Sequence, residues 1–254
     1  SKPVHFPDIT YSFYPVYCKL FGIDYKTIPL GKDFEINLDD YMTPNGGVIF
    51  PNPNAPTGRS IPRSEIETLL AKNQESVLVI DEAYVDYGTE SCVPLLRGTN
   101  CPENLLVVHT LSKSRALAGL RVGFAVGHPT LIEGLERVKN SFNSYPLGRL
   151  AQAGAIAAIE DQAHLQETSA KVIQTRTNLI KQLDELGFDT LPSTANFIFT
   201  RHPKHAGQKL YQALRDRGII VRHFKSPRIE EFLRITIGTD EQSGELVALK
   251  EILG

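Results

Sequence analysis

Four short apolar runs limit what this chain can fold into more than any other feature. They are rich in β-branched residues, are too short for helices, and lie at 48–50, 77–80, 105–108 and 122–126. Continuous apolar strands of this kind fit a sheet that is covered on both faces. Because an amphipathic stretch separates two of the runs, the pattern predicts an α/β layered domain.

The amphipathic stretch at 61–73 is predicted to be a helix. Ser64 and Glu67 have the spacing of a capping box, and the apolar residues Ile66, Leu69 and Leu70 lie close behind them. A strand is also predicted at 4–6, at the start of the chain.

The pattern changes after about Pro146, where a long helical stretch begins. One helical face carries aliphatic side chains, and Gly187 is a natural stop for the helix. These aliphatic residues are Leu165, Val172, Leu179, Leu183 and Leu186. A strand (196–200), a helix (206–217), two strands (218–222 and 232–237) and a closing helix (240–253) follow. We therefore expect a large α/β domain over 1–150 and a smaller α+β domain over 151–254.

Composition excludes several classes of protein. The formal net charge of the 254 residues is −2, so nothing indicates a nucleic-acid stripe or a membrane-surface patch. No apolar run is long enough to span a bilayer, and no signal peptide is visible at the start. Cys18, Cys92 and Cys101 lack metal-ligand or redox spacing, which favours the reducing cytoplasm. His202 and His205 flank a proline in a polar loop, and a solvated loop is favoured there over a zinc site.

Two of the predicted strands end in polar clusters. The first runs into Asp81-Glu82-Ala83-Tyr84, and an acid beyond a strand end can face a ligand or simply cap a turn. The second runs into a stretch from His109 to Arg115 that contains Thr110, Ser112 and Lys113. Hydroxyls and cations here suit a phosphate pocket, and such a lysine can form a Schiff base. Taken singly, each cluster favours the simpler alternative, a turn cap or a solvated basic loop.

A third strand ends in an unusually rigid turn. Pro51-Asn52-Pro53-Asn54-Ala55-Pro56-Thr57-Gly58 contains three prolines and a glycine. The turn is either a platform for a ligand contact or a tight connection.

Together, the three strand-end motifs resemble those of the class I/II aminotransferases. They read Asn-Ala-Pro-Thr-Gly, Asp-Glu-Ala-Tyr and Ser-Lys-Ser-x-x-Leu-Ala-Gly-Leu-Arg-x-Gly, in this order and spacing. Within these enzymes the chain is most similar to the histidinol-phosphate aminotransferase group. The resemblance covers essentially the whole chain. It implies the pyridoxal-phosphate-dependent transferase fold of type I, with a mostly parallel central sheet and a smaller C-terminal α+β domain.

The resemblance also implies a role for each matching residue. Lys113 would bond to the aldehyde of pyridoxal 5′-phosphate and then move the proton of the 1,3-shift. Asp81 would keep the ring nitrogen protonated, and Tyr84 would donate to the ring oxygen. Tyr11 would stack on the ring.

Further positions would bind anions. Thr110, Ser112 and Arg121 would hold the cofactor phosphate. Arg234 would bind the anionic group of the substrate with Arg222 beside it, although both arginines also fit a charged sheet surface.

Two departures from the family pattern bear on this site. Most relatives have asparagine, which contacts the cofactor's ring oxygen, at the position of Ala55. Either Asn54 replaces that contact or Tyr84 alone serves the oxygen. The family also has an N-terminal segment, expected upstream of Ser1, with a phosphate-binding glycine loop and an arm that reaches the partner subunit.

The expected activity is transamination between histidinol phosphate and 2-oxoglutarate in a cytoplasmic homodimer, without nucleic-acid, membrane or metal partners. An aromatic amino-acid aminotransferase and a threonine-phosphate decarboxylase are alternatives that use the same scaffold. A truncated, inactive aminotransferase-like domain is an alternative of another class.

Overall fold

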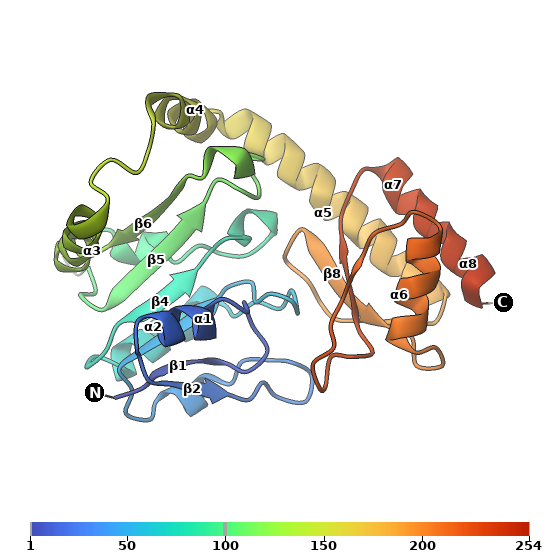
Figure 1. Cartoon of the computed structure of the whole chain (residues 1–254), viewed down its shortest axis with the longest axis horizontal. Coiled ribbons are helices and arrows are strands. Elements are labelled where there is room, and N and C mark those ends of the chain that lie inside the picture. Colours follow the sequence, from blue (N-terminus) through green and yellow to red (C-terminus); the bar gives the residue numbers. More distant parts are fainter. Residues whose placement is uncertain (1, 99–100, 254) are drawn as a thin grey trace.

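The computed structural model describes residues 2–98 and 101–253, and these form two sheets (Figure 1). The larger sheet has the strand order β2-β1-β3-β4-β5-β6. Its strands are β1 (Val4–Pro7), β2 (Tyr25–Ile28), β3 (Gly47–Pro51), β4 (Leu78–Asp81), β5 (Leu105–Thr110) and β6 (Gly123–Gly127). All neighbours pair in parallel except β5 and β6, which are antiparallel. The predicted mostly parallel α/β sheet is confirmed.

Helices cover both faces of the part of this sheet around β1 and β3. Helix α2 (Arg63–Lys72) buries Ile66, Leu69 and Leu70 in a core that also contains Phe50. Helix α1 (Tyr14–Leu20) buries Tyr14 and Cys18 in a second cluster, against which the neighbouring Ile49 packs. Since successive side chains of a strand point to opposite faces, Ile49 and Phe50 show that the two helices cover opposite faces.

The predicted capping box of α2 is wrong. The N-cap residue is Pro62, and no side chain caps the helix. Because the helix begins at Arg63, Ser64 lies within its first turn, where its hydroxyl cannot act as the N-cap acceptor.

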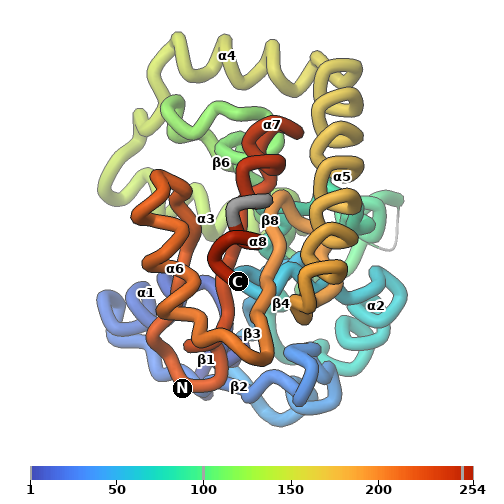
Figure 2. Tube along the Cα trace, turned by 90° about the vertical axis from the view of Figure 1, so that its right-hand side faces the viewer, coloured from blue at the N-terminus to red at the C-terminus, as the bar shows by residue number. Residues whose placement is uncertain are grey.

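Three helices follow the larger sheet: α3 (Pro129–Phe142), α4 (Arg149–Glu160) and α5 (Gln162–Glu185). The long helical stretch predicted after Pro146 is therefore two helices. The break lies at Asp161, whose carboxylate accepts a hydrogen bond from the backbone N–H of His164 (3.0 Å) and caps α5. Helix α5 runs from α4 to the second sheet and stands along one side of the molecule (Figures 1 and 2).

The smaller sheet is antiparallel throughout, with the order β7-β8-β10-β9. Its strands are β7 (Asp189–Thr190), β8 (Phe197–Arg201), β9 (Arg222–His223) and β10 (Leu233–Thr236). Helix α6 (Gly207–Asp216) and two short helices, α7 (Asp240–Gly244) and α8 (Ala248–Leu253), complete this part of the chain. Its core joins α5, α6 and the sheet through side chains such as Leu183, Leu214 and Ile198.

Several predicted boundaries differ from the structure. Of the predicted strand 218–222 only Arg222 pairs in the sheet, and β9 extends one residue further to His223, because Gly218 takes up a turn (φ +79°) that ends α6. The closing helix is divided by the 3₁₀ turn Glu245–Val247. Strands β2 and β7 are short, with four and two residues, and were not predicted. Helix α3 was also not predicted, although its 14 residues are amphipathic and begin with a proline.

Candidate active site

Asp81 lies at the carboxyl end of β4, on the sheet face that α1 covers. Its Oδ2 accepts a hydrogen bond from the Tyr14 hydroxyl (2.9 Å), and its Oδ1 accepts one from the backbone N–H of Ala83 (3.1 Å). Burial raises the pKa of Asp81, while these hydrogen bonds and the nearby charges of His109 and Lys113 lower it; the net shift is upward. The carboxylate is therefore held rigidly without a salt bridge, and a cationic ligand beside it would stabilise its charged form.

The sequence did not single out Tyr14. Its side chain is buried, and its ring meets the ring of Tyr11 edge-on with 5.5 Å between centroids. Burial and the neighbouring Asp81 raise the pKa of the Tyr14 phenol, so it remains a hydrogen-bond donor. Tyr11 precedes the helix, which begins at Tyr14, so helical spacing gave no signal for this pair of rings.

Lys113 follows β5 and is exposed, with its Nζ 5.3 Å from the centroid of the Tyr84 ring. The loop around it is anchored on both sides. Ser114 donates a hydrogen bond to the Asp86 carboxylate, and Arg115 donates to the Ala158 carbonyl near the end of α4. The structure thus brings Lys113 and Tyr84 together from two neighbouring strand ends, as predicted.

Thr110 and Ser112 form one hydroxyl pair. The Thr110 hydroxyl donates to Ser112 Oγ (2.9 Å) and accepts from the Ser112 backbone N–H (3.1 Å). Arg121 has a left-handed backbone (φ +55°) and donates to the Ala118 carbonyl. Burial raises the pKa of Tyr11, and the charge of Arg121 opposes this shift. Hydroxyls and a guanidinium are suitable donors for a phosphate.

Arg234 comes from β10 of the smaller sheet, and it is opposite Arg222 of β9. The Arg234 guanidinium lies over the Phe197 ring (5.2 Å to the centroid), and its buried Nε has no hydrogen-bond partner. Burial lowers the pKa of Arg234, and nearby Arg222 adds to this effect, while Tyr84 opposes it. Phe197 in turn meets Tyr84 edge-on at 5.1 Å, so the two sheets meet beside Tyr84.

No acidic side chain pairs with Arg234 within residues 2–98 and 101–253. Arg222 is more exposed, and its guanidinium lies over the Phe224 ring (5.5 Å). Arg234 is half-buried, and a guanidinium whose buried Nε lacks a partner is unfavourable unless an anion completes it. Arg234 is therefore built to receive an anionic ligand.

The Asn54 amide is used within the protein. Its Nδ2 donates to the Ile9 carbonyl (3.0 Å) and to the Thr57 hydroxyl (3.1 Å), and its Oδ1 accepts from the Thr10 hydroxyl (2.9 Å). Since an amide nitrogen has two hydrogens, no Asn54 donor remains for a ligand. Of the two alternatives raised by Ala55, this geometry favours Tyr84 as the donor to the ring oxygen.

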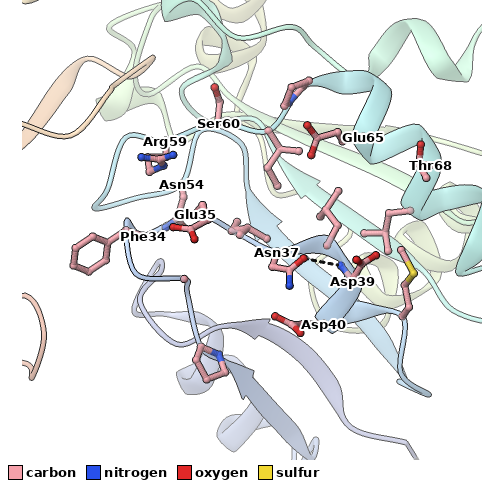
Figure 3. Close-up of a pocket in the computed structure, with 18 of the residues that line it drawn as sticks. Phe34, Glu35, Asn37, Asp39, Asp40, Asn54, Arg59, Ser60, Glu65 and Thr68 are labelled. Carbon is pink, nitrogen blue, oxygen red and sulfur yellow. Dashed lines mark hydrogen bonds between the residues drawn. The ribbon is translucent and has the colours of Figure 1, made fainter.

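A cavity of about 660 Å³ lies next to the proline-rich turn and is shown in Figure 3. Carboxylates dominate its charged lining, among them Glu35, Asp39 and Asp40. Asn54 is the residue that it shares with the predicted site, and Lys113 and Asp81 do not line it. The predicted site residues lie outside this cavity, around Lys113 and Tyr84.

This donor set fits pyridoxal phosphate, the cofactor that the motifs imply. A fixed carboxylate, an exposed lysine, a phenol and a hydroxyl pair lie at adjacent strand ends, and an unpartnered arginine faces them. The described residues contain no cluster of His, Cys, Asp or Glu that could hold a metal ion, and none of their helices could cross a membrane.

Solved structures share this architecture. The histidinol-phosphate aminotransferase from Clostridium acetobutylicum matches 99% of this chain, and 78% of its own chain is covered, with a TM-score of 0.90 at 23% identity. The fold is that of the pyridoxal-phosphate-dependent transferases of fold type I.

The family is shown by the sequence comparisons. The model of aminotransferase class I and II matches residues 1–249, and this chain belongs to that family. "Histidinol-phosphate aminotransferase 2" of Thiobacillus denitrificans is 63% identical over 99% of the chain and 70% of the relative. The protein of the same name from Dechloromonas aromatica is 61% identical over 100% of the chain and 71% of the relative.

Proposed function

We propose that this protein is a pyridoxal-phosphate-dependent aminotransferase that moves the amino group between histidinol phosphate and 2-oxoglutarate, as a step of histidine biosynthesis. The choice of amino donor is supported by relatives of that name at about three-fifths identity. The observation that carries the proposal is the half-buried Arg234, which has no acidic partner in the described chain and packs on Phe197, the ring that contacts Tyr84. An anionic amino donor suits that position.

Lys113 would hold the cofactor and then carry the proton between the two carbons of the transfer. Asp81 would pair with the ring nitrogen, and Tyr14 holds Asp81 in place. When bound, the cofactor supplies the electron sink for the transfer. Tyr84 would donate to the ring oxygen, and Tyr11 would cover one ring face.

The anionic groups would be held by two sets of donors. Thr110, Ser112 and Arg121 would bind the cofactor phosphate, and Arg234 would bind the phosphate of the amino donor or a carboxylate of the 2-oxo acid. Arg222 would add a second positive charge near Arg234. We retain Asn54 as a residue that shapes the turn and not as a ligand contact.

The same proposal includes a cytoplasmic homodimer with domains at 1–150 and 151–254. Large apolar side chains are exposed on α1 and around α3 and α4, and a second copy of the chain would cover them. They include Leu20, Phe21, Phe142, Tyr145 and Leu150, each at least 69% exposed.

The cofactor assignment is tested by absorbance after pyridoxal phosphate is added to the full-length protein. We expect the visible band of a lysine-linked cofactor, and we expect Lys113→Ala to abolish it. Lys139→Ala, a change in a lysine of α3, is the control and should keep the band. No band in the wild-type protein would refute the enzyme and leave an inactive aminotransferase-like domain.

Half-reactions with histidinol phosphate, phenylalanine and threonine phosphate then identify the donor. The fastest amino transfer is expected from histidinol phosphate. A preference for phenylalanine would indicate an aromatic aminotransferase, and release of carbon dioxide from threonine phosphate would indicate a decarboxylase.

A further inference from the structure

Arg176 lies in the middle of α5 and is buried (7% exposed). Its Nη1 donates to the backbone carbonyls of Tyr87 (3.0 Å) and Ala195 (2.7 Å). No carboxylate pairs with it in the part of the chain that the structure describes. Burial therefore lowers the pKa of Arg176, and its charge is balanced by carbonyl dipoles alone.

The two carbonyls belong to different halves of the site. Tyr87 ends the 3₁₀ turn Val85–Tyr87, which directly follows Tyr84 in the chain. Ala195 lies just before β8, whose Phe197 ring contacts Tyr84 on one side and the Arg234 guanidinium on another. The Arg176 side chain thus joins the backbone that follows Tyr84 to the backbone that precedes β8, next to Arg234.

The two regions also meet in a separate place, where Arg228 donates to the Asp8 carboxylate (3.1 Å) and Phe34 packs against Phe199 and Phe232. Beside Tyr84, however, few contacts accompany those of Arg176. The Thr89 hydroxyl donates to the Thr194 hydroxyl (2.7 Å), and the Thr194 backbone N–H donates to the Gly58 carbonyl (2.9 Å). Ala55, Ala195 and Phe197 form a small apolar cluster, and Tyr84 packs against it. Arg176 is the only charged side chain among these contacts beside Tyr84.

Burial of a cation that has no acidic partner costs desolvation free energy, so a gain in stability does not explain Arg176. Replacement of buried charged groups by apolar residues of similar size is often neutral or stabilising. A planar guanidinium, however, can serve two carbonyls in a defined direction, which lysine cannot reproduce. The geometry of Arg176 therefore fits a role in holding the backbone at Tyr87 and the backbone at Ala195 at a fixed distance.

We infer that Arg176 is a positioning residue that sets the distance between Arg234 and the Lys113–Tyr84 centre, and through it the preference for a phosphate-bearing amino donor. This inference rests on the proposed function. A shift of the smaller sheet by a fraction of an ångström would leave the cofactor contacts intact, because these come from the larger sheet. It would misplace the guanidinium that receives the substrate anion.

The test uses Arg176→Gln and Arg176→Lys in the full-length protein, with Thr194→Val as a milder change in the same joint. Lys171→Gln is the matched control, since Lys171 is an exposed cation on the same helix. Amino transfer is measured from histidinol phosphate and from phosphate-free histidinol. Cofactor affinity is measured by absorbance titration.

For Arg176→Gln, the KM for histidinol phosphate should rise about tenfold, and the preference over histidinol should shrink by a similar factor. The cofactor Kd should change less than about twofold. Arg176→Lys should recover part of the preference, and Thr194→Val should lose less of it. An equal loss for both donors, or an unchanged KM with only a lower unfolding midpoint, would show that Arg176 is merely structural.

A second readout needs no substrate. Hydrogen–deuterium exchange of the cofactor-free protein should become faster over residues 194–199 in Arg176→Gln, while β3 and β4 keep their protection. If the wild type transfers from neither donor, the proposed function fails, and exchange alone tests the joint. Unchanged exchange at 194–199 would overturn the inference.

Discussion

The larger sheet places its site residues just beyond strand ends, whereas the smaller sheet places Arg234 within an antiparallel strand. Asp81 ends β4 and Lys113 follows β5, so chain direction alone brings them to one edge. Arg234 is opposite Phe199 of β8 and Arg222 of β9 in the sheet register. Its position depends on how the whole smaller sheet packs beside Tyr84.

The two regions also differ in how they satisfy their charges. Asp81 accepts two protein hydrogen bonds, while the buried Nε of Arg234 has none. The carboxylate on the larger sheet is therefore hydrogen-bonded within the protein, whereas the guanidinium on the smaller sheet keeps a donor that is available for a ligand. We therefore expect that mutations in the two regions change cofactor binding and substrate binding separately.

The largest expected effect separates the two regions directly. Asp81→Asn keeps one acceptor oxygen in place of the two that serve Tyr14 and Ala83, and it loses the charge proposed to pair with the ring nitrogen. Amino transfer should therefore fall by several orders of magnitude, and cofactor affinity should weaken. Arg234→Met should leave cofactor affinity unchanged and weaken binding of an anionic donor by about 100-fold. Spectral titration and steady-state kinetics measure both. Loss of cofactor affinity in Arg234→Met would break the comparison.

Stability gives the Asp81→Asn variant a second readout. The pKa of Asp81 is raised in the folded state, so its contribution to stability is present below its ordinary pKa of about 3.9 and is lost as pH rises through the folded pKa. Without cofactor at neutral pH, Asp81→Asn should therefore be more stable than wild type, by on the order of 1 kcal/mol. Urea unfolding should show that this gain disappears toward acid pH. A less stable Asn variant at neutral pH would contradict the sign.

A smaller effect is expected from Tyr14→Phe, which removes one donor to Asp81 and nothing from the smaller sheet. Hydrogen bonds to charged groups contribute about 1.5–3 kcal/mol, so cofactor affinity should fall by roughly 10- to 100-fold. The KM of the amino donor should hardly change at saturating cofactor. Tyr17→Phe, on the exposed side of α1, is the control. An equal loss in both variants would mean that the Tyr14 hydroxyl does not act through Asp81.

The smallest effect concerns the pH dependence of the larger sheet. His5 of β1 is buried, its Nδ1 has no hydrogen-bond partner, and burial together with Lys26 lowers its pKa. As the pH falls, His5 takes up its proton at a higher pH in the unfolded chain than in the folded chain. Its contribution to the free energy of unfolding is therefore complete above about pH 6.5 and decreases as the pH drops toward the folded pKa.

His5→Gln should therefore flatten the loss of stability between about pH 7 and about pH 5. Urea midpoints at several pH values measure this slope, and His164→Gln on the exposed face of α5 is the control. An unchanged slope would show that another group causes the acid sensitivity. His202 after β8 is an example, because burial also lowers its pKa.

The site residues also differ in how far the sequence alone could predict them. Strand-end patterns in the larger sheet drew attention to Asp81, Tyr84 and Lys113, and the resemblance of the three motifs to an enzyme family supplied the roles proposed for them. By sequence alone Asn54 is a ligand candidate, and only its three partners in the fold show that its hydrogens are taken. Tyr14 and Arg176 were missed, since their partners lie 67 and at least 19 residues away in the chain.

Local sequence determined the alternation of strands and helices in the larger sheet, because β-branched runs and amphipathic stretches encode their own period. It also placed polar clusters at the strand ends, where the family resemblance predicts the site. Only the tertiary structure decided that Tyr14 holds Asp81, that Arg234 is left without an acidic partner in the described chain, and that Arg176 joins the two halves. These properties depend on long-range packing, which desolvates some polar groups, pairs others and leaves a few for a ligand.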